Sequence, residues 1–162
     1  MPVTDVRKDP RTLTMTITCS FDAPVERVWE LWADPRQLER WWGPPTYPAT
    51  FERHDLSPGG DVTYFMTGPE GDRPRGWWRV TSATPPTQLV FEDGFATADG
   101  TPDPDMPVMG MRVDIAPSDG GGSTMAITTG FATVEDMERI LSMGMEEGLA
   151  SALSQIDDVL AG

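Results

Sequence analysis

Two short helices are predicted for Phe21–Pro45, which reads FDAPVERVWELWADPRQLERWWGPP. Pro24 suits the first position of a helix, where its missing N–H costs nothing. The second helix has its own start signal, because Asp34 can act as the N-cap and Pro35 as the first helical residue. The run Gly43-Pro44-Pro45 ends it. Four of the six tryptophans lie in this stretch, which indicates packing against a large apolar surface.

The segments on either side of these helices alternate between apolar and polar residues, as half-buried strands of an antiparallel sheet do. Thr12–Phe21 alternates strictly, and Val108–Ile115 with Ser123–Phe131 predicts a hairpin. Adjacent residues of a strand face opposite ways, so only one of Trp77 and Trp78 can enter the core, and the sequence leaves open which one. Four further strands are expected at residues 49–53, 61–66, 75–83 and 88–92.

A long helix is predicted from Thr133 to Leu160, with Thr133 as its N-cap and an apolar stripe along one face. Gly144 and Gly148 interrupt the stripe, and each should cost about 1 kcal/mol relative to alanine. Either a neighbouring element approaches closely there or the missing side chains leave open volume, and we favour close packing.

The order of these elements predicts an α+β helix-grip fold. In this fold a curved antiparallel sheet of about six or seven strands wraps around the long C-terminal helix, and two short helices follow the first strand. The length of 162 residues fits a single domain, 1–162, with residues 1–10 as a flexible N-terminus.

The composition restricts partners and location. A net charge of −14 argues against nucleic acid and against anionic membrane surfaces as partners. The N-terminal residues contain no secretory apolar segment, and no apolar run approaches membrane-spanning length, so a cytoplasmic location is expected. The single cysteine, Cys19, lies on the apolar side of its strand and is expected to be a buried, unreactive thiol.

The chain from Leu13 onward resembles a known family. The signature Ala23-Pro24-x-Glu26-Arg27-Val28-Trp29-x-x-Trp32-x-Asp34-Pro35-x-x-Leu38-x-x-Trp41-Trp42-Gly43-Pro44 is similar to the opening of the activator-of-heat-shock-protein-ATPase homologues, which belong to the START-like, or birch-allergen-like, superfamily. The runs around Phe95, Pro104–Pro107 and Met143–Gly148 resemble a bacterial branch often grouped with the calicheamicin-resistance protein. The resemblance implies a cavity between sheet and long helix, open near the short helices and Phe95.

The residue content of the inward faces also predicts a cavity. Ten methionines is a high share for this length, and methionine suits an irregular or adaptable apolar surface. The partner expected for such a cavity is a small apolar or aromatic molecule. The candidate ligand-binding residues are Trp41, Tyr64, Met66, Trp78, Phe91, Phe95, Met109, Met111, Met125, Met137, Leu141 and Met145.

Motifs for catalysis are missing from the sequence. It contains no nucleophile elbow, phosphate loop, dinucleotide fingerprint or His/Cys metal spacing, so no catalytic residue, cofactor or metal is predicted. His54, the only histidine, is interpreted as a surface residue. Asp99, Asp103 and Asp105 lie in a long loop predicted at 93–106, but their spacing does not match a calcium-binding EF-hand loop.

Three functional hypotheses follow. The first is a binding module for a small hydrophobic or aromatic molecule, acting in transport, sensing or sequestration. The second is a cyclase-like or hydratase-like enzyme in which Tyr64, His54 or an arginine moves a proton within the same cavity. The third, implied by the family name, is a protein-binding domain that stimulates a chaperone ATPase. The resemblance also leaves a homodimer open.

Overall fold

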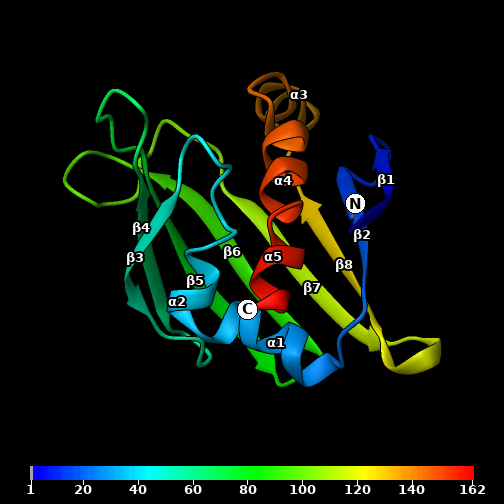
Figure 1. Ribbon diagram of the computed structural model, residues 1–162. Coiled ribbons are helices and arrows are strands. Elements are labelled where there is room, and N and C mark those ends of the chain that lie inside the picture. The colour runs from blue at the N-terminus through cyan, green and yellow to red at the C-terminus, as the bar shows by residue number, and fades with distance from the viewer. Residues whose placement is uncertain (1) are drawn as a thin grey trace.

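One antiparallel sheet of eight strands forms the larger layer of the computed structural model, which describes residues 2–162 (Figure 1). Its order is β1-β2-β8-β7-β6-β5-β4-β3, and all neighbouring strands along it are antiparallel. β7 and β8 form the predicted hairpin. The strands are β1 (Val3–Asp9), β2 (Thr14–Phe21), β3 (Ala49–His54), β4 (Asp61–Met66), β5 (Arg75–Thr84), β6 (Gln88–Ala96), β7 (Met109–Pro117) and β8 (Ser123–Gly130).

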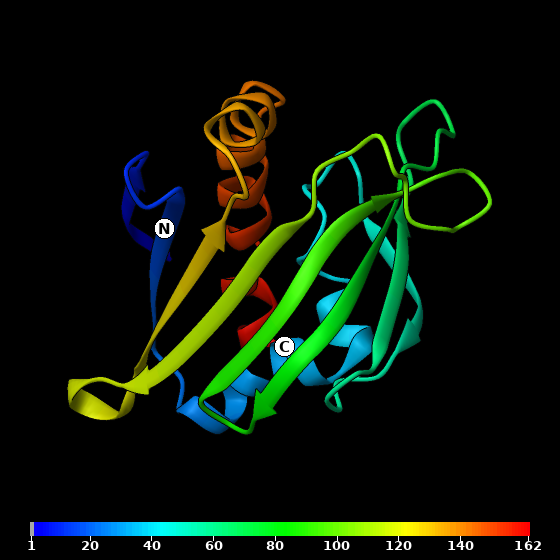
Figure 2. The same ribbon diagram turned by 180° about the vertical axis from the view of Figure 1, so that it is seen from behind.

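The helices lie on one side of this sheet. α4 and α5 cross in front of it in Figure 1, and the view from behind shows the strands in front of them (Figure 2). The predicted α+β helix-grip fold is therefore confirmed. Within residues 2–162, none of the helices is both long and apolar enough to cross a membrane. The helices are α1 (Val25–Ala33), α2 (Pro35–Leu38), α3 (Val134–Ser142), α4 (Met145–Leu153) and α5 (Ile156–Ala161), with a short 3₁₀ turn η1 (Asp119–Gly121).

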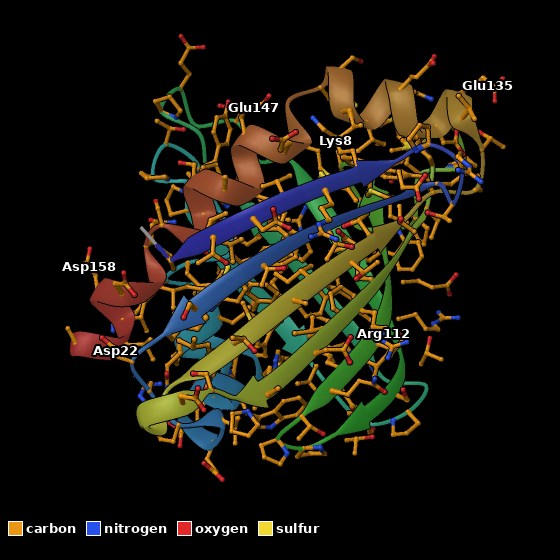
Figure 3. The ribbon with its side chains drawn as sticks, turned by 90° about the vertical axis from the view of Figure 1, so that its right-hand side faces the viewer. Lys8, Asp22, Arg112, Glu135, Glu147 and Asp158 are labelled. Atoms are coloured by element: carbon orange, nitrogen blue, oxygen red, sulfur yellow. The ribbon has the colours of Figure 1, made fainter. Side chains whose placement is uncertain are left out.

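The N-terminal segment corrects the sequence prediction. Residues 1–10 were expected to be flexible, but β1 pairs with β2 along its length, with Val6 opposite Ile17. Figure 3 shows β1 running alongside α4, and Lys8 Nζ lies 2.5 Å from Glu146 Oε1 of that helix. This edge strand raises the count to eight rather than six or seven, and the two short helices follow the second strand rather than the first.

The sequence predicted one continuous C-terminal helix, and this prediction was wrong. The structure divides the segment into α3, α4 and α5. Gly144 separates the first two with φ +89°, a left-handed conformation that favours glycine. Figure 3 shows α3 and α4 running in different directions on either side of this break. The predicted N-cap is present, because the Asp136 N–H donates to Thr133 Oγ1 at 3.0 Å.

Four of the six tryptophans, Trp32, Trp41, Trp42 and Trp78, form one aromatic core between α1, the turn after α2, and the sheet. Trp32 and Trp41 meet edge to face with ring centroids 4.7 Å apart, and Trp78 stacks on Phe91 at 4.2 Å. Trp78 is therefore the inward residue of its pair, whereas Trp77 lies on the outer face and donates from Nε1 to the Phe95 carbonyl at 3.0 Å.

The structure also defines the surroundings of Cys19 and His54. Cys19 is buried as predicted, and that burial raises the pKa of its thiol to about 12. His54 was interpreted as a surface residue, but it is half-buried and its Nε2 lies 2.9 Å from the Trp32 carbonyl oxygen. It therefore joins the end of β3 to α1 and stays apart from the cavity described below.

Candidate functional site

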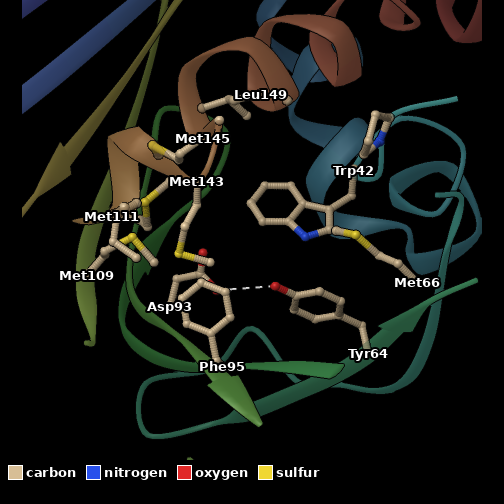
Figure 4. A pocket seen from close by; sticks show the side chains of 14 residues that line it. Trp42, Tyr64, Met66, Asp93, Phe95, Met109, Met111, Met143, Met145 and Leu149 are labelled. Atoms are coloured by element: carbon tan, nitrogen blue, oxygen red, sulfur yellow. Dashed lines mark hydrogen bonds between the residues drawn. The ribbon is translucent and has the colours of Figure 1, made fainter. Parts of the chain in front are cut away.

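A cavity of about 240 Å³ lies between the sheet and the start of α4 (Figure 4). Strands β4, β6 and β7 supply one wall, α3 and α4 supply the other, and the turn after α2 closes one side. Most of the lining is apolar and includes five methionines, of which Met66 lies beside Trp42 in Figure 4, apart from the other four. The lining residues are Trp42, Pro44, Tyr64, Met66, Asp93, Phe95, Met109, Met111, Ile140, Met143, Gly144, Met145, Gly148 and Leu149.

Two glycines keep this space open. Apart from its chain neighbours and its own helix backbone, a Cβ added at Gly148 would meet no atom of residues 2–162 within 4 Å, and one at Gly144 would meet only a Glu147 oxygen at 3.9 Å. The preference for close packing at these positions was therefore wrong, and the alternative of open volume is correct. Because a glycine exposes no side chain, the cavity extends up to the backbone of α4.

A polar pair lies on the sheet side of the cavity. The Tyr64 hydroxyl of β4 donates to Asp93 Oδ1 of β6 at 3.3 Å, the dashed line in Figure 4. These strands are separated by β5, so the Tyr64 ring must reach across it. Gly76 of β5 makes this reach feasible, because a Cβ at that position would collide with the end of the Tyr64 ring.

Burial changes the acidity of both groups. It raises the pKa of Asp93 to about 7, and the hydrogen bond from Tyr64 offsets only part of that effect. Burial, together with the charge of Asp93, holds the pKa of Tyr64 well above 10. Near neutral pH Tyr64 is therefore protonated, and Asp93 divides between its neutral and ionised forms. Asp93 retains some accessible surface because it lines the cavity.

Two indole N–H groups lie close to this pair. Trp42 and Trp78 meet edge to face with centroids 4.9 Å apart, and the Trp42 ring also meets Tyr64 edge to face at 6.1 Å. Both Nε1 atoms are buried near the Tyr64 hydroxyl and act to lower its pKa, but neither makes a hydrogen bond of normal geometry among residues 2–162. In Figure 4 the indole nitrogen of Trp42 is on the side of its ring that faces Tyr64. The site thus combines an apolar wall with a small group of donors and one carboxyl.

Half of the sequence-predicted site residues lie on the cavity wall, and ligand binding by them stays a prediction. The other half pack beside the cavity as core. Trp41, for example, donates from Nε1 to the Leu31 carbonyl at 2.9 Å, and Met125 accepts from Trp32 at 3.3 Å. The wall residues are Tyr64, Met66, Phe95, Met109, Met111 and Met145; the core residues are Trp41, Trp78, Phe91, Met125, Met137 and Leu141.

Sequence reasoning missed several wall residues, and Asp93 matters most among them. The strand was predicted to end at residue 92, whereas β6 continues to Ala96, which places Phe91, Asp93 and Phe95 on one face. The period-two pattern was therefore present and could have identified Asp93. Trp41 and Trp42 could each wall a pocket or hold the helices to the sheet, but they lie in a turn, where no periodicity indicates which of the two faces the cavity. The residues missed are Trp42, Pro44, Asp93, Ile140, Met143, Gly144, Gly148 and Leu149.

Comparison with known families agrees with this architecture. Residues 22–161 match the family described as Activator of Hsp90 ATPase homolog 1-like protein. The chain belongs to this family. The resemblance carried by the signature at residues 23–44 is thereby confirmed. Among curated proteins, no match was found.

Solved structures of similar proteins extend over almost the whole chain. Protein Ms6760 from Mycobacterium smegmatis is 48% identical, with a TM-score of 0.91 over 98% of this chain and 97% of that one. A protein from Arthrobacter aurescens is 47% identical, with a TM-score of 0.94 over 98% and 92%. CalU16 from Micromonospora echinospora is 18% identical, with a TM-score of 0.59 over 91% and 75%, and shares the fold alone.

Proposed function

We propose that this protein binds a small hydrophobic or aromatic molecule in the cavity beside α4, as a cytoplasmic carrier, sensor or sequestering protein. The observation that carries the proposal is an apolar cavity of about 240 Å³ left open at Gly148. An apolar cavity of about 150 Å³ accepts benzene, and pockets for drug-sized ligands begin near about 300 Å³. The volume of this cavity lies between these two values, so it would accommodate a ligand of one or two rings.

Thermal unfolding against a library of small apolar and aromatic molecules tests the proposal. A ligand present at about one hundred times its Kd adds about 2.7 kcal/mol to the free energy of unfolding, which raises Tm by several degrees. Gly148→Phe should fill the cavity and remove the shift, whereas Gly148→Ala should retain it. A library without a hit, or an equal shift in Gly148→Phe, would contradict binding at this site.

A second candidate function is a cyclase-like or hydratase-like enzyme that uses the same cavity. The observation that favours it is Asp93, whose pKa of about 7 suits a group that takes up or releases a proton near neutral pH. Each ligand found by thermal unfolding would be incubated with the wild type and with Asp93→Asn. A product that forms only with the wild type would support turnover, and a ligand recovered unchanged would support binding alone.

A protein-binding role that stimulates a chaperone ATPase is less favoured. Docking surfaces are contiguous apolar patches of several hundred Å². Among residues 2–162, the large apolar side chains that are exposed are Val108, Val134 and Met143. Met143 lines the cavity, so its exposure has an explanation in ligand entry.

A further inference from the structure

The cavity contains a hydrogen-bond donor that makes no well-formed hydrogen bond within the described part of the chain. Trp42 lines the cavity with only 7% of its surface exposed, and its Nε1–H lies near enough to the Tyr64 hydroxyl to favour the ionised form of that group, but it makes no hydrogen bond of normal geometry among residues 2–162. The large majority of buried side-chain polar atoms in folded proteins have a partner, so an unpaired buried N–H needs an explanation. A ligand in the cavity can supply the acceptor.

Packing holds this donor in place before any ligand arrives. The Trp42 ring is fixed by edge-to-face contacts with Trp32, Trp41, Trp78 and Tyr64 at centroid distances from 4.9 to 6.1 Å. Trp78 also has an unpaired N–H, but it is wholly buried behind the wall and stacked on Phe91. Trp42 is therefore the better placed of the two to donate to a ligand.

Charge narrows the class of ligand. An anion would meet the Asp93 carboxyl in a protein of net charge −14, and no Lys, Arg or His stands among the cavity-lining residues of 2–162. A cation could pair with Asp93 where that carboxyl is ionised, but an ammonium group has no lone pair with which to accept from the Trp42 N–H, so this donor would stay unpaired. An uncharged oxygen acceptor avoids both conflicts.

We propose that the ligand is an uncharged aromatic carbonyl compound whose oxygen accepts a hydrogen bond from Trp42 Nε1–H. This inference rests on the proposed function, since it describes recognition in the same cavity. The ring of the ligand lies among the methionines and Phe95, and its oxygen lies on the side of Trp42 and Tyr64. Trp42 is then a specificity-determining residue, because it separates a carbonyl compound from a hydrocarbon of the same shape.

Four probes of one size separate the classes: acetophenone, cumene, 1-phenylethylamine and benzoate. Their affinities would be measured by NMR titration of the ¹⁵N-labelled protein. We expect acetophenone to bind about tenfold more tightly than cumene, which is about 1.4 kcal/mol, and more tightly than the amine and benzoate. The Trp42 Nε1–H resonance should move downfield with acetophenone alone.

Substitution of the donor completes the test. Trp42→Phe keeps an aromatic ring and removes the N–H, so cumene should still bind while the preference for acetophenone disappears. Trp29→Phe, on α1 away from the cavity, should keep the preference. If Trp42→Phe does not fold, the Trp42 Nε1–H shift in the wild type decides the question alone.

The outcomes distinguish this inference from the function on which it rests. Equal binding of acetophenone and cumene, or an unmoved Trp42 resonance, would overturn carbonyl recognition while leaving apolar ligand binding intact. Tighter binding of the amine or of benzoate would overturn it in favour of a charged ligand. Failure of all four probes to bind would overturn both.

Discussion

Replacing Asp93 by asparagine should change how the stability of the protein depends on pH. Burial raises the pKa of this carboxyl from the ordinary 3.8 to about 7, so the folded protein keeps the proton to a higher pH than the unfolded chain does. Between these two values unfolding releases a proton, and the free energy of unfolding falls as pH rises. The cost of burying Asp93 as a carboxylate is therefore absent below pH 4 and is complete above about pH 7.

The magnitude follows from the same two values. The difference between 3.8 and about 7, at about 1.4 kcal/mol for each pH unit, corresponds to about 4 kcal/mol. This figure is a ceiling, because Asp93 retains some contact with water through the cavity. Asparagine cannot ionise but can still accept from the Tyr64 hydroxyl. Relative to the wild type, Asp93→Asn should gain up to about 4 kcal/mol between pH 4 and pH 7.

Urea unfolding of both proteins from pH 4 to pH 8 measures this gain. Other ionisable groups also change the stability of the protein with pH, so only the difference between variant and wild type isolates Asp93. Glu92→Gln is the matched control, because it removes one carboxylate from the exposed face of the same strand. A difference between Asp93→Asn and the wild type that stays constant over this range would refute the burial of an ionisable Asp93.

Three further predictions concern glycines and the thiol. Gly76→Ala should lower the free energy of unfolding by about 1–3 kcal/mol in urea titrations, because the added Cβ collides with Tyr64. Gly110→Ala is the control, because a Cβ there meets no atom of residues 2–162 within 4 Å beyond its chain neighbours, and equal losses in the two variants would argue against the collision. Gly148→Ala should raise stability by up to about 1 kcal/mol, whereas Gly144→Ala at φ +89° should lower it by about 1 kcal/mol or more; a stabilising Gly144→Ala in calorimetry would contradict the left-handed break. Cys19, with its pKa raised to about 12, should not react with Ellman's reagent at pH 8 until the protein is unfolded, and rapid labelling of the native protein would show that the thiol is accessible.

Periodicity in the sequence predicted most of the sheet and failed where periodicity is weak. β2, β7 and β8 each bury alternate residues, so their strands could be identified from apolar spacing alone. β1 is an edge strand in which only Val3 and Val6 pack against the core, so it carries no alternation to detect. Its position depends on pairing with β2 and on contact with α4, which are long-range features.

The site was harder to predict than the fold because its position depends on a break in a helix. The apolar stripe from Thr133 to Leu160 continues across Gly144, so the spacing of apolar residues gave no sign that α3 and α4 diverge. Six of the twelve candidate residues lie inward without reaching the cavity, since the same apolar pattern marks core and cavity wall alike. Asp93 was missed for a different reason: the strand was predicted to end one residue before it, and a charged residue at an inward position conflicts with the expectation that inward residues are apolar.

The position of a carboxyl among inward residues is one of three features that favour a binding site in this cavity. Gly148 lowers the stability of α4 relative to alanine, Asp93 is a carboxyl withdrawn from water, and Trp42 has a buried N–H that makes no hydrogen bond of normal geometry among residues 2–162. Each of these features opposes folding, and all three line one cavity. Core packing alone would favour alanine at position 148, an apolar residue at position 93 and a hydrogen-bonded indole at position 42. Local violations of folding rules that gather at one place are characteristic of sites selected for binding or catalysis. A ligand that fills the space at Gly148 and accepts from Trp42 would relieve two of the three at once.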